Sequence, residues 1–169
     1  METENTELDG VLKIRPPTNF EDFRGCYVEI YNKNLFAQKN IHLEFVQDDI
    51  SVSRQNVLRG IHGDKKTWKL VSCLFGSFYL VVINNIPDSA QYGKWQGFTL
   101  SDKNRFQILI PPGFGNGHLV LTKEAVFHYK QTSEYDRSSQ FTILYNDPDK
   151  KIFWPTSNPI ISPRDSGWK

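Results

Sequence analysis

Short runs of alternating apolar and polar residues dominate this chain, and helical periodicity is nearly absent. The run CYVEIYN (26–32) alternates with a period of two, as a half-buried β-strand does. The run Phe78–Ile83 is continuously apolar, which is typical of a strand buried on both faces. Turn residues recur about every 8–12 positions, a spacing that indicates a β-sandwich or barrel. The pattern predicts an all-β domain with one short helix within residues 32–40.

The same pattern sets the expected boundaries. Residues 1–10 contain few apolar side chains and are expected to form a flexible N-terminus, followed by a single domain over residues 11–169. Pro111 and Pro112 are expected to exclude a central strand and to mark a tight connection. The proline-rich stretch from Asp147 onward is expected to wrap the barrel surface. Strands are expected at residues 11–14, 26–32, 42–53 (with a break near Asp48–Asp49), 68–85 (two strands joined at residues 75–77), 96–104, 106–113, 117–122, 125–132 and 140–147.

Charge and composition argue against several classes of protein. The 169 residues carry a formal net charge of +1, so no overall field favours nucleic acid or an anionic membrane as a partner. No apolar run approaches the roughly 18–20 residues that cross a bilayer. The two cysteines, Cys26 and Cys73, form no CxxC or zinc spacing. Two reduced thiols suit a cytoplasmic protein.

The stretch Asn56–Leu70 holds the densest group of candidate functional residues. Arg59 and His62 flank Gly60, and Lys69 follows a charged turn, among apolar neighbours that indicate a partly dry pocket. A base, a fixed cation and a lysine are the groups that move a proton next to a carbonyl. Period-two alternation points Arg59 away from His62. A shared site therefore requires a bulge at Gly60 or a position at the strand end.

An ordered set of motifs covers the chain from about Val11 to Asp165. FEDFRG, FVQDD, NVLRGIH, KLV, YGKW, IPPGF, VFHYK, NDP, WP and SPRD follow one another, and in this order they resemble the dTDP-4-dehydrorhamnose 3,5-epimerase family. The resemblance implies a double-stranded β-helix, the cupin-like jelly roll, and a homodimer without metal or other cofactor. It implies inversion of C3, C5 or both in a nucleoside-diphosphate 4-keto-6-deoxy sugar. The variant RGIHGDKKTWKLV looks more like epimerases of other nucleotide-linked sugars, including GDP-4-keto-6-deoxy-heptoses.

The resemblance also assigns catalytic roles. His62 matches the general base, and Asp165 matches the carboxylate that orients its ring. Lys69 matches the lysine facing the ketone oxygen, where an ammonium stabilises an enolate. Tyr129 matches the donor that returns a proton from the opposite side, since a phenol stays protonated near neutral pH. Alternation then predicts that His128 points away from the site.

Substrate-binding positions carry over in the same way. Arg59 suits a diphosphate through its bidentate guanidinium, and Tyr135 suits a base through its ring face. Arg24 is implied to reach the pocket of a partner subunit. The remaining matches to nucleotide- or sugar-contacting positions are Glu29, Gln47, Asp49 and Asn116.

Three departures from the family pattern bear on the sugar pocket. Asn116 stands where many members carry a histidine, and it cannot exchange protons near neutral pH. His118, two residues later, is a candidate replacement. Tyr79 stands where an aspartate is usual, and Asp49 replaces an asparagine. All three substituted positions are expected to reshape the pocket, and they leave open which sugar is bound and which carbon is inverted.

Other functions on the same fold remain alternatives. A GDP-linked 4-keto-heptose epimerase, a sugar 3,4-ketoisomerase and a non-catalytic nucleotide-sugar-binding cupin each fit part of the pattern. A metal-dependent cupin is disfavoured because the chain contains no HxH pair. The combination of His62, Lys69 and Tyr129 argues for a catalyst rather than a binding module.

Overall fold

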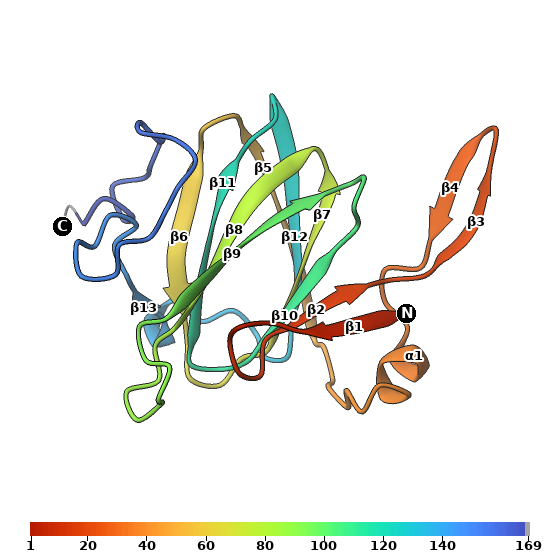
Figure 1. Cartoon of the computed structure of the whole chain (residues 1–169), viewed down its shortest axis with the longest axis horizontal. Coiled ribbons are helices and arrows are strands. Elements are labelled where there is room, and N and C mark those ends of the chain that lie inside the picture. Colours follow the sequence, from red (N-terminus) through yellow and green to blue (C-terminus); the bar gives the residue numbers. More distant parts are fainter. Residues whose placement is uncertain (168–169) are drawn as a thin grey trace.

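The computed structural model describes residues 1–167, whose two large antiparallel sheets face each other and are accompanied by a small two-stranded hairpin sheet (Figure 1). From β5 to β12 the chain passes repeatedly from one sheet to the other, as in a jelly roll. The predicted all-β architecture is confirmed. The six-stranded sheet has the order β1 (Glu2–Asn5), β2 (Leu12–Arg15), β10 (Gln107–Ile110), β7 (Lys69–Phe75), β12 (Glu124–Gln131), β5 (Gln47–Arg54). The five-stranded sheet has the order β13 (Phe141–Thr142), β6 (Leu58–Gly63), β11 (Phe114–Val120), β8 (Ser77–Asn84), β9 (Trp95–Ser101).

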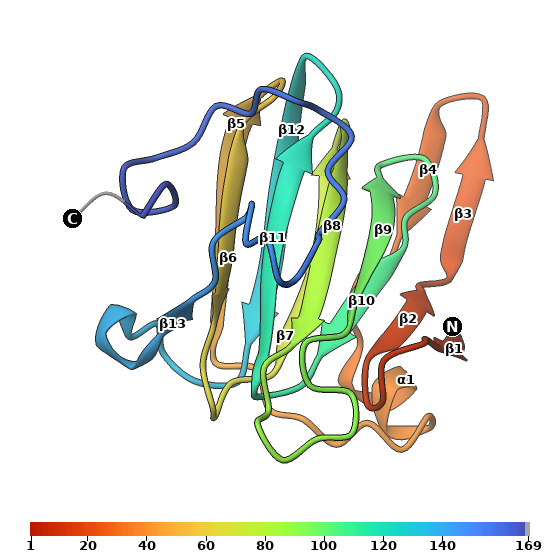
Figure 2. The ribbon, with the colours of Figure 1, turned by 60° about the vertical axis from the view of Figure 1, so that its left-hand side comes forward.

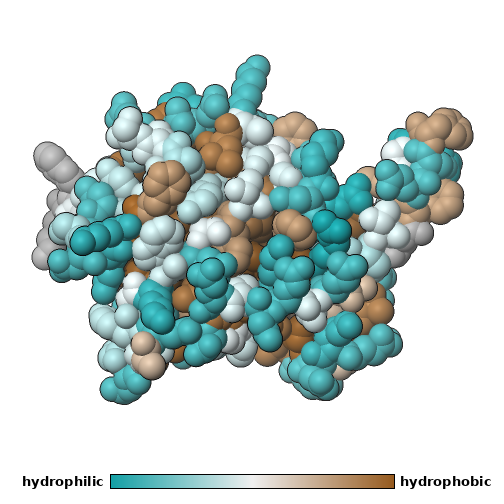
Figure 3. All heavy atoms as spheres, viewed as in Figure 1, coloured by the Kyte–Doolittle hydropathy of each residue, from teal (hydrophilic) through white to brown (hydrophobic). Residues whose placement is uncertain are grey.

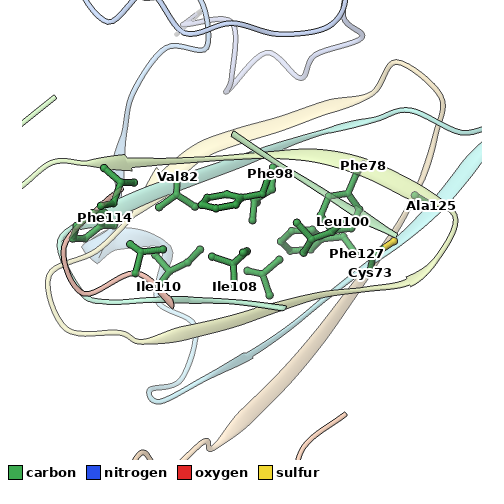
Figure 4. Packing of buried hydrophobic residues seen from close by; sticks show 14 of the residues in the cluster. Cys73, Phe78, Val82, Phe98, Leu100, Ile108, Ile110, Phe114, Ala125 and Phe127 are labelled. Carbon is green, nitrogen blue, oxygen red and sulfur yellow. The ribbon is translucent and has the colours of Figure 1, made fainter. Parts of the chain in front are cut away.

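The main hydrophobic core fills the space between the two sheets (Figure 4). Its aromatic members come from strands of both sheets, with Phe78 on β8 packed against Phe127 on β12 at 5.2 Å between ring centroids. Every second residue of these strands points inward, so burial of these side chains holds the sheets together. Within residues 1–167, no helix is long and apolar enough to cross a membrane.

Several boundaries differ from the sequence prediction. In place of a flexible end at residues 1–10, residues 2–5 form β1 on the sheet edge, and Leu8 is buried in the core. The break near Asp48–Asp49 is absent because β5 pairs with β12 along its whole length. The tight connection at Pro111–Pro112 is present. However, the central strand β11 begins at Phe114, immediately after it, rather than at residue 117.

The C-terminal segment wraps the outer face of the five-stranded sheet, as predicted (Figure 2). Ile152 and Trp154 pack there, together with Tyr79, against a buried cluster that contains Ile61. Tyr79 was expected to reshape the sugar pocket, but this expectation is wrong. Its ring lies on the outer face of the sheet, edge-on to Trp154, with 6.1 Å between ring centroids.

A hairpin of β3 (Thr18–Asp22) and β4 (Gly25–Val28) extends away from the sheets (Figure 1). Apolar side chains gather at its tip (Figure 3), and Phe23 is 98% exposed. The short helix α1 (Lys33–Ala37) follows the hairpin, within the range that was predicted. Asn32 caps it by accepting hydrogen bonds from two backbone N–H groups.

Candidate active site

A cavity of about 340 Å³ lies between the two sheets, bounded by β5, β7 and β12 on one side and β6 and β11 on the other. The loop after β12 and the C-terminal segment complete its wall. Seven predicted site residues line it: Arg59, His62, Lys69, Asn116, Tyr129, Tyr135 and Asp165. His118, the candidate replacement for the pocket histidine, lines it together with Asn116, and the structure adds Ser51, Gly60, Phe127, Gln140, Ser162 and Arg164.

His62 and Asp165 form a pair at one wall. His62 Nε2 lies 2.8 Å from Asp165 Oδ1, which leaves Nδ1 as the ring nitrogen that can take a proton. Asp165 Oδ2 also accepts a hydrogen bond from the Gly60 N–H at 3.3 Å. Burial alone would raise the pKa of Asp165, but hydrogen bonding and attraction to His62 outweigh it and hold this pKa below its usual value. Asp165 therefore stays ionised and fixes the orientation of the His62 ring.

The arrangement around Gly60 resolves the conflict over Arg59. The pairing of β6 with β11 shifts register between Asn116 and His118, opposite Gly60. Gly60 has a φ of +109°, a conformation that L-residues with side chains rarely adopt. Because of this irregularity, Arg59 and His62 line the same cavity. The requirement for a bulge, derived from simple alternation, is met.

We expect Gly60→Ala to unfold the protein or to lower its free energy of unfolding by roughly 2–5 kcal/mol. An added Cβ would lie 2.6 Å from Gly117 Cα and 2.7 Å from the Asn116 carbonyl oxygen, both backbone atoms. Gly25→Ala is a matched control, since Gly25 has a φ of +127° with nothing within 4 Å of its Cβ position. Urea denaturation followed by circular dichroism compares the two. Equal losses of stability would contradict the packing argument.

Lys69 and Tyr129 come from the opposite sheet. Lys69 Nζ lies 5.8 Å from the centroid of the Tyr129 ring. Burial lowers the pKa of Lys69, partly offset by Asp64. Burial and the neighbouring carboxylate of Asp49 raise the pKa of Tyr129 well above its usual value, so its hydroxyl stays protonated. His62 and Tyr129 thus approach the cavity from facing walls. As alternation predicts, His128 lies outside the lining and contacts Asp48 at 3.5 Å.

Four predicted binding residues lie outside the lining. Gln47 accepts a hydrogen bond from the Tyr135 N–H at 2.8 Å and donates one to Asp49 at 2.8 Å. Gln47 and Asp49 therefore contact residues near the cavity without lining it themselves. Arg24 sits at the hairpin tip, where it pairs with Asp22 at 2.6 Å. Glu29 accepts a hydrogen bond from Asn32. The structure of one chain brings neither Arg24 nor Glu29 to the cavity.

Sequence reasoning missed several lining residues that motifs could have indicated. Arg164 directly precedes Asp165 in SPRD, and it donates a hydrogen bond to Gln140 at 3.0 Å. Ser51 lies two residues beyond Asp49 on β5, hence on the same face. Gln140 and Ser162 lie outside regular strands, where alternation gives no information on direction.

The unusual pair Gly63–Asp64 shapes a loop rather than the cavity. Asp64 accepts hydrogen bonds from the N–H groups of Lys66 and Thr67, at 2.9 and 2.7 Å, as an Asx turn does. A side chain on Gly63 would collide with the Phe114 carbonyl. Neither residue lines the cavity. This part of the variant motif therefore reports on the connection between β6 and β7, and not directly on the sugar.

Comparison with known proteins decides the family. Residues 5–169 match the family model described as dTDP-4-dehydrorhamnose 3,5-epimerase. The chain belongs to this family. The dTDP-4-dehydrorhamnose 3,5-epimerase of Escherichia coli is 41% identical to it over 95% of this chain and 89% of the relative.

Members of this epimerase family also share its three-dimensional structure. The dTDP-6-deoxy-D-glucose-3,5-epimerase of Legionella pneumophila, solved in complex with dTDP-4-keto-L-rhamnose, superposes with a TM-score of 0.92. It is 36% identical, and the match covers 98% of this chain and 89% of that one. The dTDP-4-dehydrorhamnose 3-epimerase of Streptomyces niveus is 33% identical over 94% of this chain and 78% of that protein. The family's cupin-like jelly roll and its epimerase activity thus apply to this chain, and the ketoisomerase and non-catalytic alternatives are not favoured.

Proposed function

We propose that this epimerase inverts both C3 and C5 of a dTDP-linked 4-keto-6-deoxy sugar. The observation that carries the proposal is the placement of His62 and Tyr129 on facing walls of one cavity. Inversion needs a base on one side of the ring and a proton donor on the other. The Legionella pneumophila relative, solved with dTDP-4-keto-L-rhamnose, supports the choice of nucleotide and sugar class.

The reaction proceeds through an enolate. Hydrogens on C3 and C5 are acidic because the electron pair left by deprotonation spreads onto the C4 ketone oxygen. Nδ1 of His62 takes the proton, and Asp165 stabilises the resulting imidazolium. The ammonium of Lys69 stabilises the enolate oxygen. Tyr129 then protonates the same carbon from the opposite side, which inverts it. The Tyr129 phenolate that results takes a proton from solvent, and His62 releases its proton to solvent, so both groups return to their starting states.

Arginines in the lining provide a place for the diphosphate. Arg59 and Arg164 lie at the cavity and carry the planar guanidinium that binds phosphate oxygens in pairs. Ser53 holds the Arg59 side chain by accepting a hydrogen bond from Nε at 2.9 Å. Tyr135 lines the same cavity and offers a ring face to the base of the nucleotide.

A homodimer accounts for the hairpin and for Arg24. The hairpin exposes Phe20, Phe23 and Tyr27, a cluster that a second subunit would cover. Arg24 directly follows Phe23 at the hairpin tip. In the dimer its guanidinium would then line the cavity of the partner subunit rather than the cavity of its own chain. Sedimentation in solution tests this, and a monomeric species with full activity would contradict it.

Cys26 and Cys73 are unpaired, which supports a reducing compartment such as the cytoplasm.

A panel of dTDP-, GDP- and CDP-4-keto-6-deoxy sugars incubated in D2O tests the proposal. Proton NMR reports which nucleotide is accepted, which ring protons exchange, and the configuration of the product. We expect exchange at C3 and C5 with the dTDP sugar and little with the others. Preferred turnover of a GDP-linked 4-keto-heptose would contradict the proposed substrate. Exchange at C3 alone would favour the activity of the Streptomyces niveus relative, named as a 3-epimerase.

A further inference from the structure

Two polar side chains on β11 have no role in the proton transfers. Asn116 and His118 lie two residues apart and both line the cavity. Asn116 Oδ1 and His118 Nε2 are buried, and neither has a hydrogen-bond partner within residues 1–167. His118 as a whole is 4% exposed. A buried polar atom without a partner is unfavourable, so a ligand that supplies one gains affinity at this wall.

His118 is held as a neutral hydrogen-bonding group. Its ring stacks on Phe127, with 4.1 Å between centroids and 8° between planes. Phe78 lies against it at 5.3 Å. Burial, and then the charge of Arg59, lower the pKa of His118 to about 3, although Asp165 opposes this. An imidazole in this setting carries no charge near neutral pH. It therefore serves as a fixed hydrogen-bonding group rather than as an acid.

The register of β6 and β11 orders these groups along the substrate. Asn116 pairs with His62, and His118 pairs with Arg59. In the proposed reaction His62 works at C3 and C5, while Arg59 holds the diphosphate that is attached to C1. On a pyranose ring C2 lies between C1 and C3. His118 therefore stands near the C1 end of the ring, where C2 and the ring oxygen both lie between C1 and the reacting carbons. The C2 hydroxyl is the group there that can both donate and accept a hydrogen bond.

We propose that His118 is a specificity-determining residue that forms a hydrogen bond with the C2 hydroxyl of the sugar. This inference rests on the proposed function, because that function places the diphosphate and the reacting carbons. Its consequence is selectivity against 2-deoxy sugars. A site built around a substrate hydroxyl disfavours the analogue that lacks it, because the protein group is left unpartnered.

Binding of dTDP-glucose and of dTDP-2-deoxyglucose provides the test. Both lack the C4 ketone, so neither is turned over, and calorimetry gives their dissociation constants. We expect the unmodified enzyme to bind dTDP-glucose about 10- to 100-fold more tightly. In His118→Phe, which keeps an aromatic ring for stacking on Phe127, the two ligands should bind with similar affinity. His42→Gln, at an exposed position outside the cavity, is the matched control and should keep the preference.

Equal affinities in the unmodified enzyme, or a preference that survives in His118→Phe, would overturn the proposal. A second measurement does not depend on the folding of the variant. In the unmodified enzyme with 15N-labelled histidine, the His118 ring signals should shift more with dTDP-glucose than with its 2-deoxy analogue, and identical shifts would also overturn it. Absence of ring-proton exchange in the D2O panel would refute the proposed epimerisation. The binding comparisons involve no reaction, so their outcome tests the role of His118 independently of that result.

Discussion

His62→Asn is expected to slow exchange of the C3 and C5 protons in D2O by about a thousandfold or more, within the range for loss of a general base. Asparagine fills similar space and can still hydrogen-bond to Asp165, but it cannot accept a proton near neutral pH. Calorimetry should find the affinity for dTDP unchanged, because Arg59 and Tyr135 remain in the cavity lining. Proton NMR of the 4-keto sugar measures the exchange rate directly.

The control for this substitution is His42→Asn, at an exposed position outside the cavity. It should leave both exchange and dTDP binding as they are. Exchange at the unmodified rate in His62→Asn would remove His62 from the role of base. Loss of dTDP binding together with exchange would instead indicate that the substitution damages the cavity as a whole.

Tyr129→Phe is expected to separate proton exchange from inversion. The His62–Asp165 pair is intact in this variant, so protons are still removed, exchanged with solvent and returned from the same side. Inversion needs delivery from the opposite wall, and its rate should fall by about a hundredfold or more. The substrate would therefore gain deuterium while keeping its configuration. NMR of the recovered sugar gives deuterium content and stereochemistry from one sample.

Tyr92→Phe is the matched control, since Tyr92 is 49% exposed and lies outside the cavity lining. It should invert and exchange at the unmodified rates. Equal losses of exchange and inversion in Tyr129→Phe would contradict the assignment of Tyr129 as the opposing donor. In that case Tyr129 would act on both steps, through the shape or charge of the cavity.

The placement of the central site residues was predictable because they lie in short motifs, most of them on regular strands. Alternation correctly separated Tyr129 from His128, and the motif SPRD correctly brought Asp165 to His62. The direction of the Arg59 side chain could not be predicted from alternation alone, because it depends on the register shift opposite Gly60. That shift arises from close approach of two glycine-containing strands, a tertiary contact that no local pattern encodes.

Other errors have equally physical causes. Tyr79 was expected at the pocket because it stands where the family usually carries an aspartate, but one position along a strand exchanges the two faces of the sheet. Its ring faces the side of the sheet that the C-terminal segment covers, and that contact lies far from Tyr79 in the sequence. The N-terminal ten residues looked unstructured because β1 is polar. The strand forms because Leu8 is buried beyond it, and because β2 offers an edge with open backbone hydrogen-bonding groups.

The position of Asp165 within the C-terminal segment places one member of the proposed catalytic pair outside the strands of both sheets. Within the described residues, the last strand of the two sheets ends at Thr142. Asp165, whose carboxylate contacts His62, lies 23 residues further along the chain. In the proposed mechanism, a chain that ends before Asp165 keeps every strand of the two sheets but lacks the carboxylate beside His62.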